Sequence, residues 1–431
     1  MMLNGLPFFN AQANAKASGG SVIADGAFVA LVFVLATCAF RTSNNTASRW
    51  AWIYGGAYLS WWVLQVVLGS PGVPVVAAAE YGREFMYFAT LLPLLMLALR
   101  DQRTREGFIF VLCSGAALFS VGQIATQLGH PVEWLVHDSH INSFEGVSRV
   151  YAPMSDLVIA LFPLALAASL LGPRRWRKHA GILALLTGVA NILSFTRAVY
   201  LSESVAIAVV SVLWMNRGRI RAMIIACVCL MAVAVPLASG AASTSSVSGS
   251  PVQAVISRVS LAFSNLQQPS GTAALRLRED HVELQLLGGD WLTGLGFLSP
   301  RYRYFGDLPE GSIKDVDLGS VTILATAGLV GLLFAYVGPI VGLLYFLRRR
   351  EGFVQYGGAI YLTAALIGSA TLATFASVSG LLVLASVLAV CFNDPLQAKE
   401  RSASATRRIA GVSSPLVGRG GLHFDEPVPA Q

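Results

Sequence analysis

Residues 318–347 read LGSVTILATAGLVGLLFAYVGPIVGLLYFL and contain no charged side chain. An α-helix rises about 1.5 Å per residue, so about 20 apolar residues cross the hydrocarbon core of a bilayer. The run therefore predicts a membrane-spanning helix, although it is longer than one perpendicular span needs. Its helix-perturbing residues are Gly328, Gly331, Gly338 and Pro339. They predict that the helix breaks or kinks, or that the run begins with a short segment outside the membrane.

Similar apolar runs recur along all 431 residues, of which 55% are hydrophobic and only 12% charged. Soluble domains carry about 25% charged residues, so the composition excludes a soluble enzyme. The runs also lack the polar and apolar alternation of membrane β-barrel strands. We predict an all-α polytopic integral membrane protein with about 11 transmembrane helices. The predicted spans are 21–40, 50–69, 82–99, 107–128, 154–171, 180–195, 199–215, 222–240, 318–347, 355–374 and 379–393.

Basic residues gather between the apolar runs, on one side of the membrane if the spans alternate in direction. The four densest clusters are Arg100, Arg103 and Arg105; Arg174, Arg175, Arg177 and Lys178; Arg217, Arg219 and Arg221; and Arg348, Arg349 and Arg350. Lysine and arginine mark cytoplasmic loops, so we interpret the net charge of +7 as a topology signal and not as a nucleic-acid surface. This orientation puts the N-terminus outside and the C-terminus inside.

The spans divide the chain into five predicted regions. They are a periplasmic N-terminus (1–20), transmembrane helices 1–8 (21–240), a long periplasmic loop (241–317), transmembrane helices 9–11 (318–395) and a disordered cytoplasmic tail (396–431). Loops as long as the periplasmic one are uncommon and often functional. Within it, residues 275–287 predict an amphipathic helix at the membrane surface. One face of this helix carries Arg276, Asp280 and Glu283, and another carries Leu277, Leu284 and Leu287.

Charged residues are nearly absent from the middles of the spans, where an ion-coupled transporter usually has them. They gather instead at the predicted outer ends of spans and in the long loop. The set comprises Arg83, Glu84, Arg149, Asp156, Arg197, Glu203, Arg258, Arg276, Arg278, Arg301, Arg303, Asp315 and Asp317. Guanidinium groups bind phosphate oxygens bidentately, so an arginine-lined surface at headgroup depth predicts an anionic lipid-linked ligand such as a diphosphate.

Arg197 is the most informative of these residues. It lies in the stretch NILSFTRAVYLS (191–202), between a short apolar run and another that follows at once, so we expect a tight turn that contains an arginine. Outer loops avoid arginine, which favours a functional role. The alternative is a topological arginine whose side chain extends to the membrane interface.

This stretch resembles a motif of a known family. Leu193-Ser-Phe-Thr-Arg-Ala198 resembles the T-x-S-R-G/A turn of the O-antigen ligase and polymerase (Wzy-type) superfamily. Thr196 stands where serine is usual, and Ala198 stands where glycine is frequent. Further along, Arg276 followed by Gly294-Leu-Gly296 resembles that family's R…P-x-x-G-x-G segment, with Trp291 in place of the proline.

A third segment follows directly. Residues 317–331, DLGSVTILATAGLVG, resemble the family's H-N-x₉-G-x-x-G segment, with the same spacing to Gly328 and Gly331. Asp317 occupies the place of the histidine that ligases tend to keep, and Asp317-x-Gly319 fits the D-x-G form of some polysaccharide polymerases. Arg149 resembles the arginine that precedes the family's fifth or sixth span. The resemblance covers roughly residues 145–345.

The resemblance implies a metal-independent, inverting glycosyltransferase of the all-helical membrane (GT-C) type that needs no cofactor. Its donor and acceptor would be undecaprenyl-diphosphate-linked oligosaccharides in the lipid bilayer, and its active site would face the periplasm from the bacterial inner membrane. Chain-length regulator and flippase proteins are the implied partners. The alternatives are an O-antigen ligase of the same fold, or a flippase or transporter of lipid-linked oligosaccharides.

The resemblance also implies roles for individual residues. Arg197 and Arg276 would stabilise charge on the leaving diphosphate, with Arg278 as a substitute one helical step away. Asp317 would act as general base, or as a simple helix N-cap. Arg149 would hold the second lipid carrier. Arg301 and Arg303, which alternate with tyrosines, would bind sugars or headgroups or anchor the loop at the interface.

Four further features have predicted structural roles. We interpret Asp156 and Glu203 as buried hydrogen-bonding partners of a nearby arginine, and His281 as a surface histidine. The GxxxG spacing of Gly338 and Gly342 is interpreted as ordinary helix packing.

Overall fold

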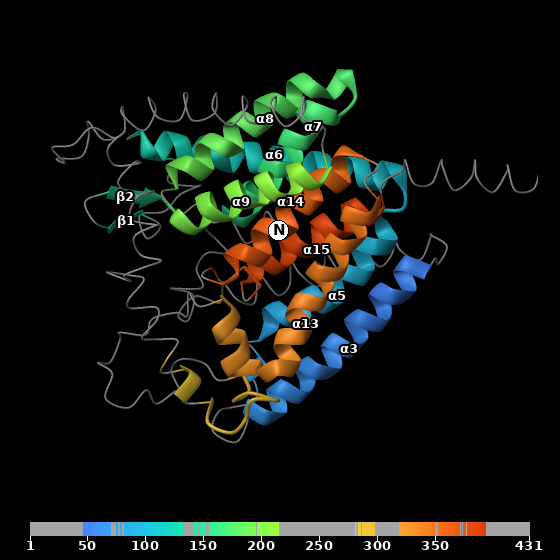
Figure 1. Cartoon of the computed structure of the whole chain (residues 1–431), viewed down its shortest axis with the longest axis vertical. Helices are drawn as coiled ribbons and strands as arrows, with labels where there is room; N and C mark the ends of the chain where they lie inside the picture. Colours follow the sequence, from blue (N-terminus) through green and yellow to red (C-terminus); the bar gives the residue numbers. More distant parts are fainter. Residues whose placement is uncertain are drawn as a thin grey trace, which may run out of the picture. The chain divides into compact units, whose positions relative to one another are not determined.

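The computed structural model is mostly helical in the portion of the chain that it describes (Figure 1). This portion comprises residues 46–69, 75, 78–79, 82–128, 130, 132, 141–144, 147–150, 155–194, 196–214, 281, 283–285, 287–297, 319–349, 352–370, 372, 374–375 and 377–393. Its main elements are α3 (Thr46–Gly69), α5 (Arg83–Ala98), α6 (Gln102–Gln127), β1 (Ile141–Phe144), β2 (Val147–Val150), α7 (Ser155–Leu171), α8 (Arg174–Leu193), α9 (Arg197–Trp214), α13 (Gly319–Arg349), α14 (Phe353–Gly368) and α15 (Val378–Phe392).

Three helical segments are long and apolar enough to cross a membrane: Arg49–Leu68, Gln102–Gln127 and Gly319–Arg349. Five shorter apolar helices accompany them within the described residues. Phe110 on α6 is 71% exposed and Trp50 on α3 is 66% exposed, as expected for side chains that face lipid. These helices are of the kind found in membrane proteins. The predicted spans 21–40 and 222–240 lie outside the described residues, as do the predicted N-terminal region (residues 1–20) and the tail (residues 396–431).

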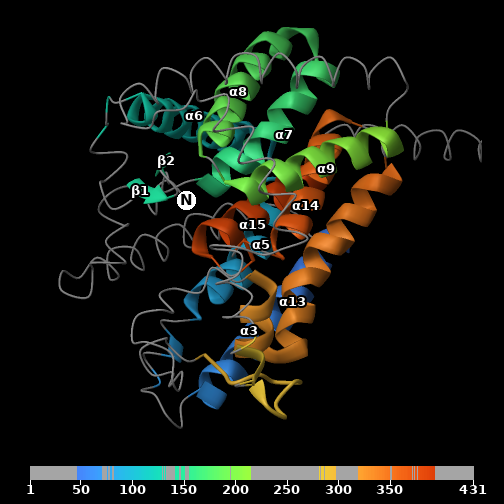
Figure 2. The ribbon, with the colours of Figure 1, turned by 60° about the vertical axis from the view of Figure 1, so that its left-hand side comes forward.

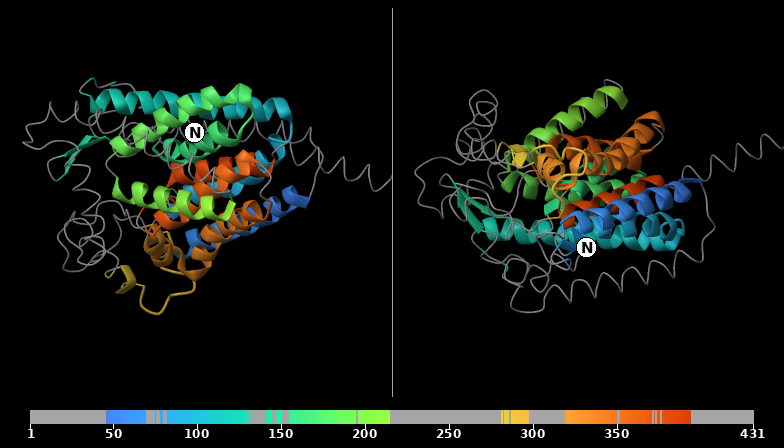
Figure 3. Two further views of the ribbon diagram at one scale, coloured as in Figure 1. Left: turned by 45° about the horizontal axis from the view of Figure 1, so that its top comes forward. Right: turned by 90° about the horizontal axis from the view of Figure 1, so that it is seen from below.

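The helices α14 and α15 form the centre of the described bundle. Figure 2 shows them between α7, α8 and α9 on one side and α3 and α13 on the other. α14 packs against α7, α9 and α13, whereas α15 packs against α5 (Figure 3). Residues 381–391 of α15 are buried throughout, which explains why their sequence, LLVLASVLAVC, is apolar on every face.

Polar contacts join α5, α6 and α15 at the end predicted to be cytoplasmic. The buried Arg105 Nη1 donates to the Asn393 carbonyl at 2.7 Å, and Asn393 Nδ2 donates to the Met96 carbonyl at 3.1 Å. Asp101 caps α6, because its carboxylate accepts the Thr104 backbone N–H at 2.8 Å and the Thr104 hydroxyl at 2.7 Å. The backbone N–H, and then the hydroxyl, lower the pKa of Asp101. Arg105 thus has a packing role besides its predicted topological one.

Some details differ from the sequence predictions. The described residues add a short antiparallel hairpin, β1–β2, to the predicted helices. The helix α8 begins at Arg174, within a basic cluster, six residues before the predicted span 180–195. Its first turns carry long basic side chains, which are good helix formers but lower the local hydropathy. The GxxxG interpretation is confirmed, because a Cβ at Gly342 would meet Leu388 and Leu362 of neighbouring helices.

Candidate functional site

The long apolar helix α13 breaks at Gly328, as the sequence predicts, with φ 66° and ψ −170°. In a continuous helix, the N–H groups of residues 329 and 330 would donate to the carbonyls of residues 325 and 326. Here the Leu329 N–H donates to the Trp291 carbonyl at 2.8 Å, and the Val330 N–H donates to the Leu292 carbonyl at 3.2 Å. The break therefore needs a second segment of chain to satisfy its backbone.

That segment is residues 291–297, which we name the glycine loop. It also satisfies the carbonyls that the break exposes. The Leu295 N–H donates to the Ala325 carbonyl at 2.9 Å, and the Gly296 N–H donates to the Thr326 carbonyl at 2.8 Å. Backbone polar groups in an apolar region must be paired, so the loop and the break stabilise each other.

Glycine is required on both sides of this contact. Gly294 has φ 70°, and a Cβ there would lie 2.5 Å from the Gly328 nitrogen. A Cβ at Gly328 would lie 2.6 Å from the Gly294 nitrogen and closer still to the Leu292 carbonyl. Two of the glycine segments that carry the family resemblance therefore meet in one close backbone contact.

The glycine loop is anchored on α3 and α5 as well. Phe297 is fully buried, and its ring stacks on Phe85 with centroids 5.5 Å apart and meets Trp61 edge-on at 5.7 Å. The Gln65 side chain donates from Nε2 to the Thr293 carbonyl at 2.8 Å, and the Gln65 carbonyl accepts the Phe297 N–H at 3.3 Å. The loop is thus held to three helices at once.

The turn between α8 and α9 is tight, as predicted, since α8 ends at Leu193 and α9 begins at Arg197. Arg197 is the first residue of the helix and not part of the turn itself, and nothing is described of its side chain. The buried Asn191 Nδ2 donates to Glu203 Oε1 at 2.9 Å and joins the two helices across the turn. Among the described side chains, Glu203 therefore has an asparagine as a partner; the side chain of the nearest arginine in sequence, Arg197, lies outside them.

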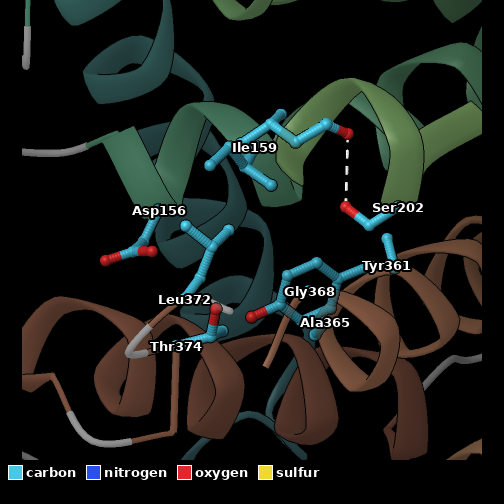
Figure 4. A pocket seen from close by; sticks show the side chains of 10 residues that line it. Asp156, Ile159, Ser202, Tyr361, Ala365, Gly368, Leu372 and Thr374 are labelled. Carbon is cyan, nitrogen blue, oxygen red and sulfur yellow. Dashed lines mark hydrogen bonds between the residues drawn. The ribbon is translucent and has the colours of Figure 1, made fainter. Parts of the chain in front are cut away.

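A small cavity, with about 20 Å³ of space for water-sized groups, lies beside the first turns of α9 (Figure 4). Its walls come from α7, α9, α14 and the segment that follows α14. Four of its lining residues are polar: Asp156, Ser202, Tyr361 and Thr374. Apolar side chains, among them Ile159, Val199 and Leu372, complete the walls. The cavity therefore combines apolar walls with a few polar groups, in a space of about the size of one water molecule.

The polar groups of this cavity differ in how they are satisfied. The Ser379 hydroxyl donates to Asp156 Oδ2, and the Ser377 hydroxyl also bonds this carboxylate. The Ser202 hydroxyl donates to the Val199 carbonyl at 3.2 Å. The Tyr361 hydroxyl is buried and has no hydrogen-bond partner among the described residues. An unsatisfied buried hydroxyl costs about 1–3 kcal/mol, which makes Tyr361 the exception that needs a reason.

The cavity adjoins two of the segments singled out by the sequence. Val199 and Ser202 follow Arg197 in the first turns of α9. On the other side, a Cβ at Gly319 would lie against the carbonyls of Ser369 and Leu372, and Leu372 lines the cavity.

The remaining predicted site residues have little or no description. Arg149 pairs with Asn142 in the β1–β2 hairpin, and only its backbone is described. The predicted site residues outside the described ranges are Arg276, Arg278, Arg301, Arg303 and Asp317.

The described end of the predicted amphipathic helix has one unexpected feature. His281 is exposed, as predicted, and its Nε2 lies 2.9 Å from Gln285 Nε2. Leu287 is 1% exposed, which fits its predicted apolar face. Glu283, however, is also only 1% exposed, although it shares the predicted polar face with Arg276.

Sequence reasoning missed Tyr361, Ser202 and Thr374 as cavity residues. Tyr361 lies in an apolar run, IYLTAALIG (360–368), where a tyrosine reads as one more apolar side chain. The Tyr361 hydroxyl is the only polar group that distinguishes this side chain from its apolar neighbours. Helical periodicity alone does not show which residues surround that hydroxyl. Asp156 carried a clearer signal, because a carboxylate in the first turn of an apolar span is rare.

The comparisons with known proteins add no assignment. No protein-family model matches the chain, and no curated protein matches it. Within the described ranges, no three histidine, cysteine, aspartate or glutamate residues gather in a way that could hold a metal ion.

Proposed function

We propose that this protein is a polysaccharide polymerase. It joins undecaprenyl-diphosphate-linked oligosaccharide repeat units on the periplasmic side of the inner membrane, in exopolysaccharide or O-antigen biosynthesis. The observation that carries the proposal is the contact between Gly294 and Gly328. Two segments that resemble one family's motifs, far apart in the sequence, depend on each other's glycines, as elements of one site would.

The reaction is one displacement at a sugar carbon. A hydroxyl of the incoming lipid-linked repeat attacks the anomeric carbon of the growing glycan, and the bond from that carbon to the diphosphate oxygen breaks. The lipid diphosphate leaves with the electron pair, and Asp317 takes the hydroxyl proton as general base. A single displacement inverts the configuration at the anomeric carbon.

The leaving diphosphate gathers negative charge, which Arg197 and Arg276 stabilise. The position of Arg197 supports this role, because it is the first residue of α9, an 18-residue helix. The N-terminus of a helix carries partial positive charge and unpaired N–H groups, and both favour an anion. A guanidinium at this position adds a full charge to that field.

The position of Gly319 supports the role of Asp317. Gly319 packs against Ser369, and the Ser320 N–H donates to the Ser369 carbonyl at 3.0 Å. Ser369 follows α14, next to the cavity beside α9. The start of α13 is therefore in the same neighbourhood as the first turns of α9, which supports a role for the segment that precedes it.

The other predicted residues have supporting roles in this proposal. Arg149 holds the second lipid carrier, and Arg278 assists Arg276. Arg301 and Arg303 bind the glycan or the lipid headgroups from the long loop. Chain-length regulator and flippase proteins act with the enzyme, before and during polymer growth.

The test is the glycan made by cells with and without this gene. Cells without it should accumulate single lipid-linked repeats on the outer leaflet and make no polymer. The variants Arg197→Ala, Arg276→Ala and Asp317→Ala should reproduce that loss at normal membrane levels, and normal polymer from all three would reject the assignment. Repeats trapped on the inner leaflet would indicate a flippase, and polymer that forms without transfer to a final acceptor would indicate a ligase.

A further inference from the structure

The Tyr361 hydroxyl on α14 is a buried donor without an acceptor among the described residues. Tyr361 is 2% exposed, and its hydroxyl makes no hydrogen bond to any of them. Buried polar groups are nearly always paired with protein or with ordered water, so this donor needs an acceptor. The hydroxyl of Tyr356, on the same helix, shows the usual arrangement, because it lies 2.7 Å from Ser211 Oγ. The place to seek an acceptor for Tyr361 is the cavity that it lines.

Asp156 on α7 has acceptor capacity to spare in the same cavity. A carboxylate can accept about four hydrogen bonds, and the described donors to Asp156 are the hydroxyls of Ser377 and Ser379. Tyr361 extends from α14 across the cavity toward Thr374, and Asp156 lies on the opposite side (Figure 4). A donor and an acceptor therefore line one small space without bonding to each other directly.

The size and polarity of this space suit one water molecule. The cavity has about 20 Å³ of space for water-sized groups, and a single buried water needs about 10–15 Å³ by the same measure. A buried water also needs two to four polar partners. Tyr361 can donate to it, Asp156 can accept from it, and Thr374 lines the cavity as a third polar residue.

A small monovalent cation such as sodium suits these groups less well than water does. A cation accepts no hydrogen bond, so the Tyr361 donor would remain unpaired beside it. We propose that this cavity is a binding site for one ordered water molecule, which accepts a hydrogen bond from Tyr361 and donates one to Asp156. The water joins α7 to α14 beside the first turns of α9. This inference does not depend on the proposed function.

The direction of the change in Tyr361→Phe tests the water site. This variant keeps the ring and removes only the hydroxyl. If the water is bound, the variant loses a hydrogen bond, and the unfolding equilibrium constant of the purified full chain, titrated with SDS in mild detergent, should rise about two- to tenfold. If the hydroxyl is unpaired, its removal abolishes a desolvation penalty and the constant falls. An unchanged or lower constant would therefore overturn the water site.

A double-mutant cycle tests whether the water reaches Asp156. Asp156→Ala removes the acceptor of the water, so Tyr361→Phe should matter less in that background. The product of the two single effects on the unfolding constant should exceed the effect of the double variant at least about twofold. Tyr356→Phe is the matched control, because Tyr356 is buried on the same helix but does not line the cavity, and its effect should be the same with and without Asp156→Ala. Independent effects of Tyr361→Phe and Asp156→Ala would overturn the bridge, and Tyr361→Phe alone decides the matter if Asp156→Ala does not fold.

The choice of salt distinguishes a water from a cation. The same titrations are run in sodium, potassium and choline chloride at equal concentration. Equal unfolding constants in the three salts support the water. Stabilisation by sodium alone, lost in Tyr361→Phe and in Asp156→Ala, would show a cation in the cavity and overturn the water site. All of these measurements concern the stability of the purified chain, so the presence or absence of polymer in cells bears only on the proposed function.

Discussion

Replacing Gly328 by alanine should displace the glycine loop from α13. Gly328 has φ 66° and ψ −170°, a backbone conformation that is essentially restricted to glycine and costs other residues about 1–3 kcal/mol. The new Cβ would also lie 2.6 Å from the Gly294 nitrogen. Backbone hydrogen bonds join the glycine loop to α13, so relieving this clash requires the two segments to separate. Retraction of the loop would break at least the two hydrogen bonds from Leu329 and Val330, worth about 1–3 kcal/mol together.

The combined loss is about 2–6 kcal/mol, which should lower the thermal midpoint of the purified 431-residue protein by about 2–7 °C. Hydrogen exchange should locate the damage, with faster exchange at the amides of Leu295 and Gly296. Gly56→Ala is the control, because Gly56 is an exposed helical glycine with nothing near its would-be Cβ. That change should be neutral or stabilise α3 by about 0.5–1 kcal/mol. An unaltered midpoint and unaltered exchange in Gly328→Ala would refute the reasoning.

Two further predictions concern the end of the bundle near α6. Arg105→Ala should destabilise the protein by about 1.5–3 kcal/mol, because it removes a charged donor to the Asn393 carbonyl, and a denaturant titration that shows no change would contradict this. The pKa of Asp101 is lowered by its bonds to Thr104, so its contribution to stability is complete above its unfolded pKa and is lost as pH falls through the lowered value. Asp101→Asn should therefore remove some of the acid sensitivity of the thermal midpoint below about pH 4, and identical pH profiles for the two proteins would count against it.

Much of the helical framework could be predicted from the sequence, because apolar runs of span length report burial or lipid contact directly. The break at Gly328 was also predictable, since glycine and proline mark the weak points of a long helix. The segment that fills the break was not. Its backbone hydrogen bonds to α13 join residues that lie far apart in the sequence, and neither periodicity nor composition carries that pairing.

The sequence singles out charged residues as candidates for the site, but it does not indicate the cavity. Arg197 stands out because arginine is unusual between two apolar runs, and it is the first residue of α9. Tyr361 does not stand out, because its role depends on which helices surround it. Glu283 is an example of the opposite kind. The helical pattern placed it on a polar face, yet its side chain is buried in the folded protein.

The glycine loop and the cavity are linked through α13. The loop holds the broken α13 to α3 and α5, and the first residues of α13 pack beside the cavity formed with α7, α9 and α14. Because the glycine loop holds the break in α13 by hydrogen bonds, the N-terminal part of α13, which begins at Gly319, is held in a defined position. The proposed general base, two residues before Gly319, would gain from that rigidity.

The most direct test of the central claim is polymerisation by the purified protein in vesicles. Wild-type protein in vesicles that hold only lipid-linked single repeats should produce longer lipid-linked chains, and should do so in the presence of a metal chelator. Arg197→Ala protein at the same density should produce none. Chains of equal length from both proteins would contradict the claim that Arg197 stabilises the leaving diphosphate, and no chains from the wild-type protein with its intact substrate would contradict polymerase activity itself.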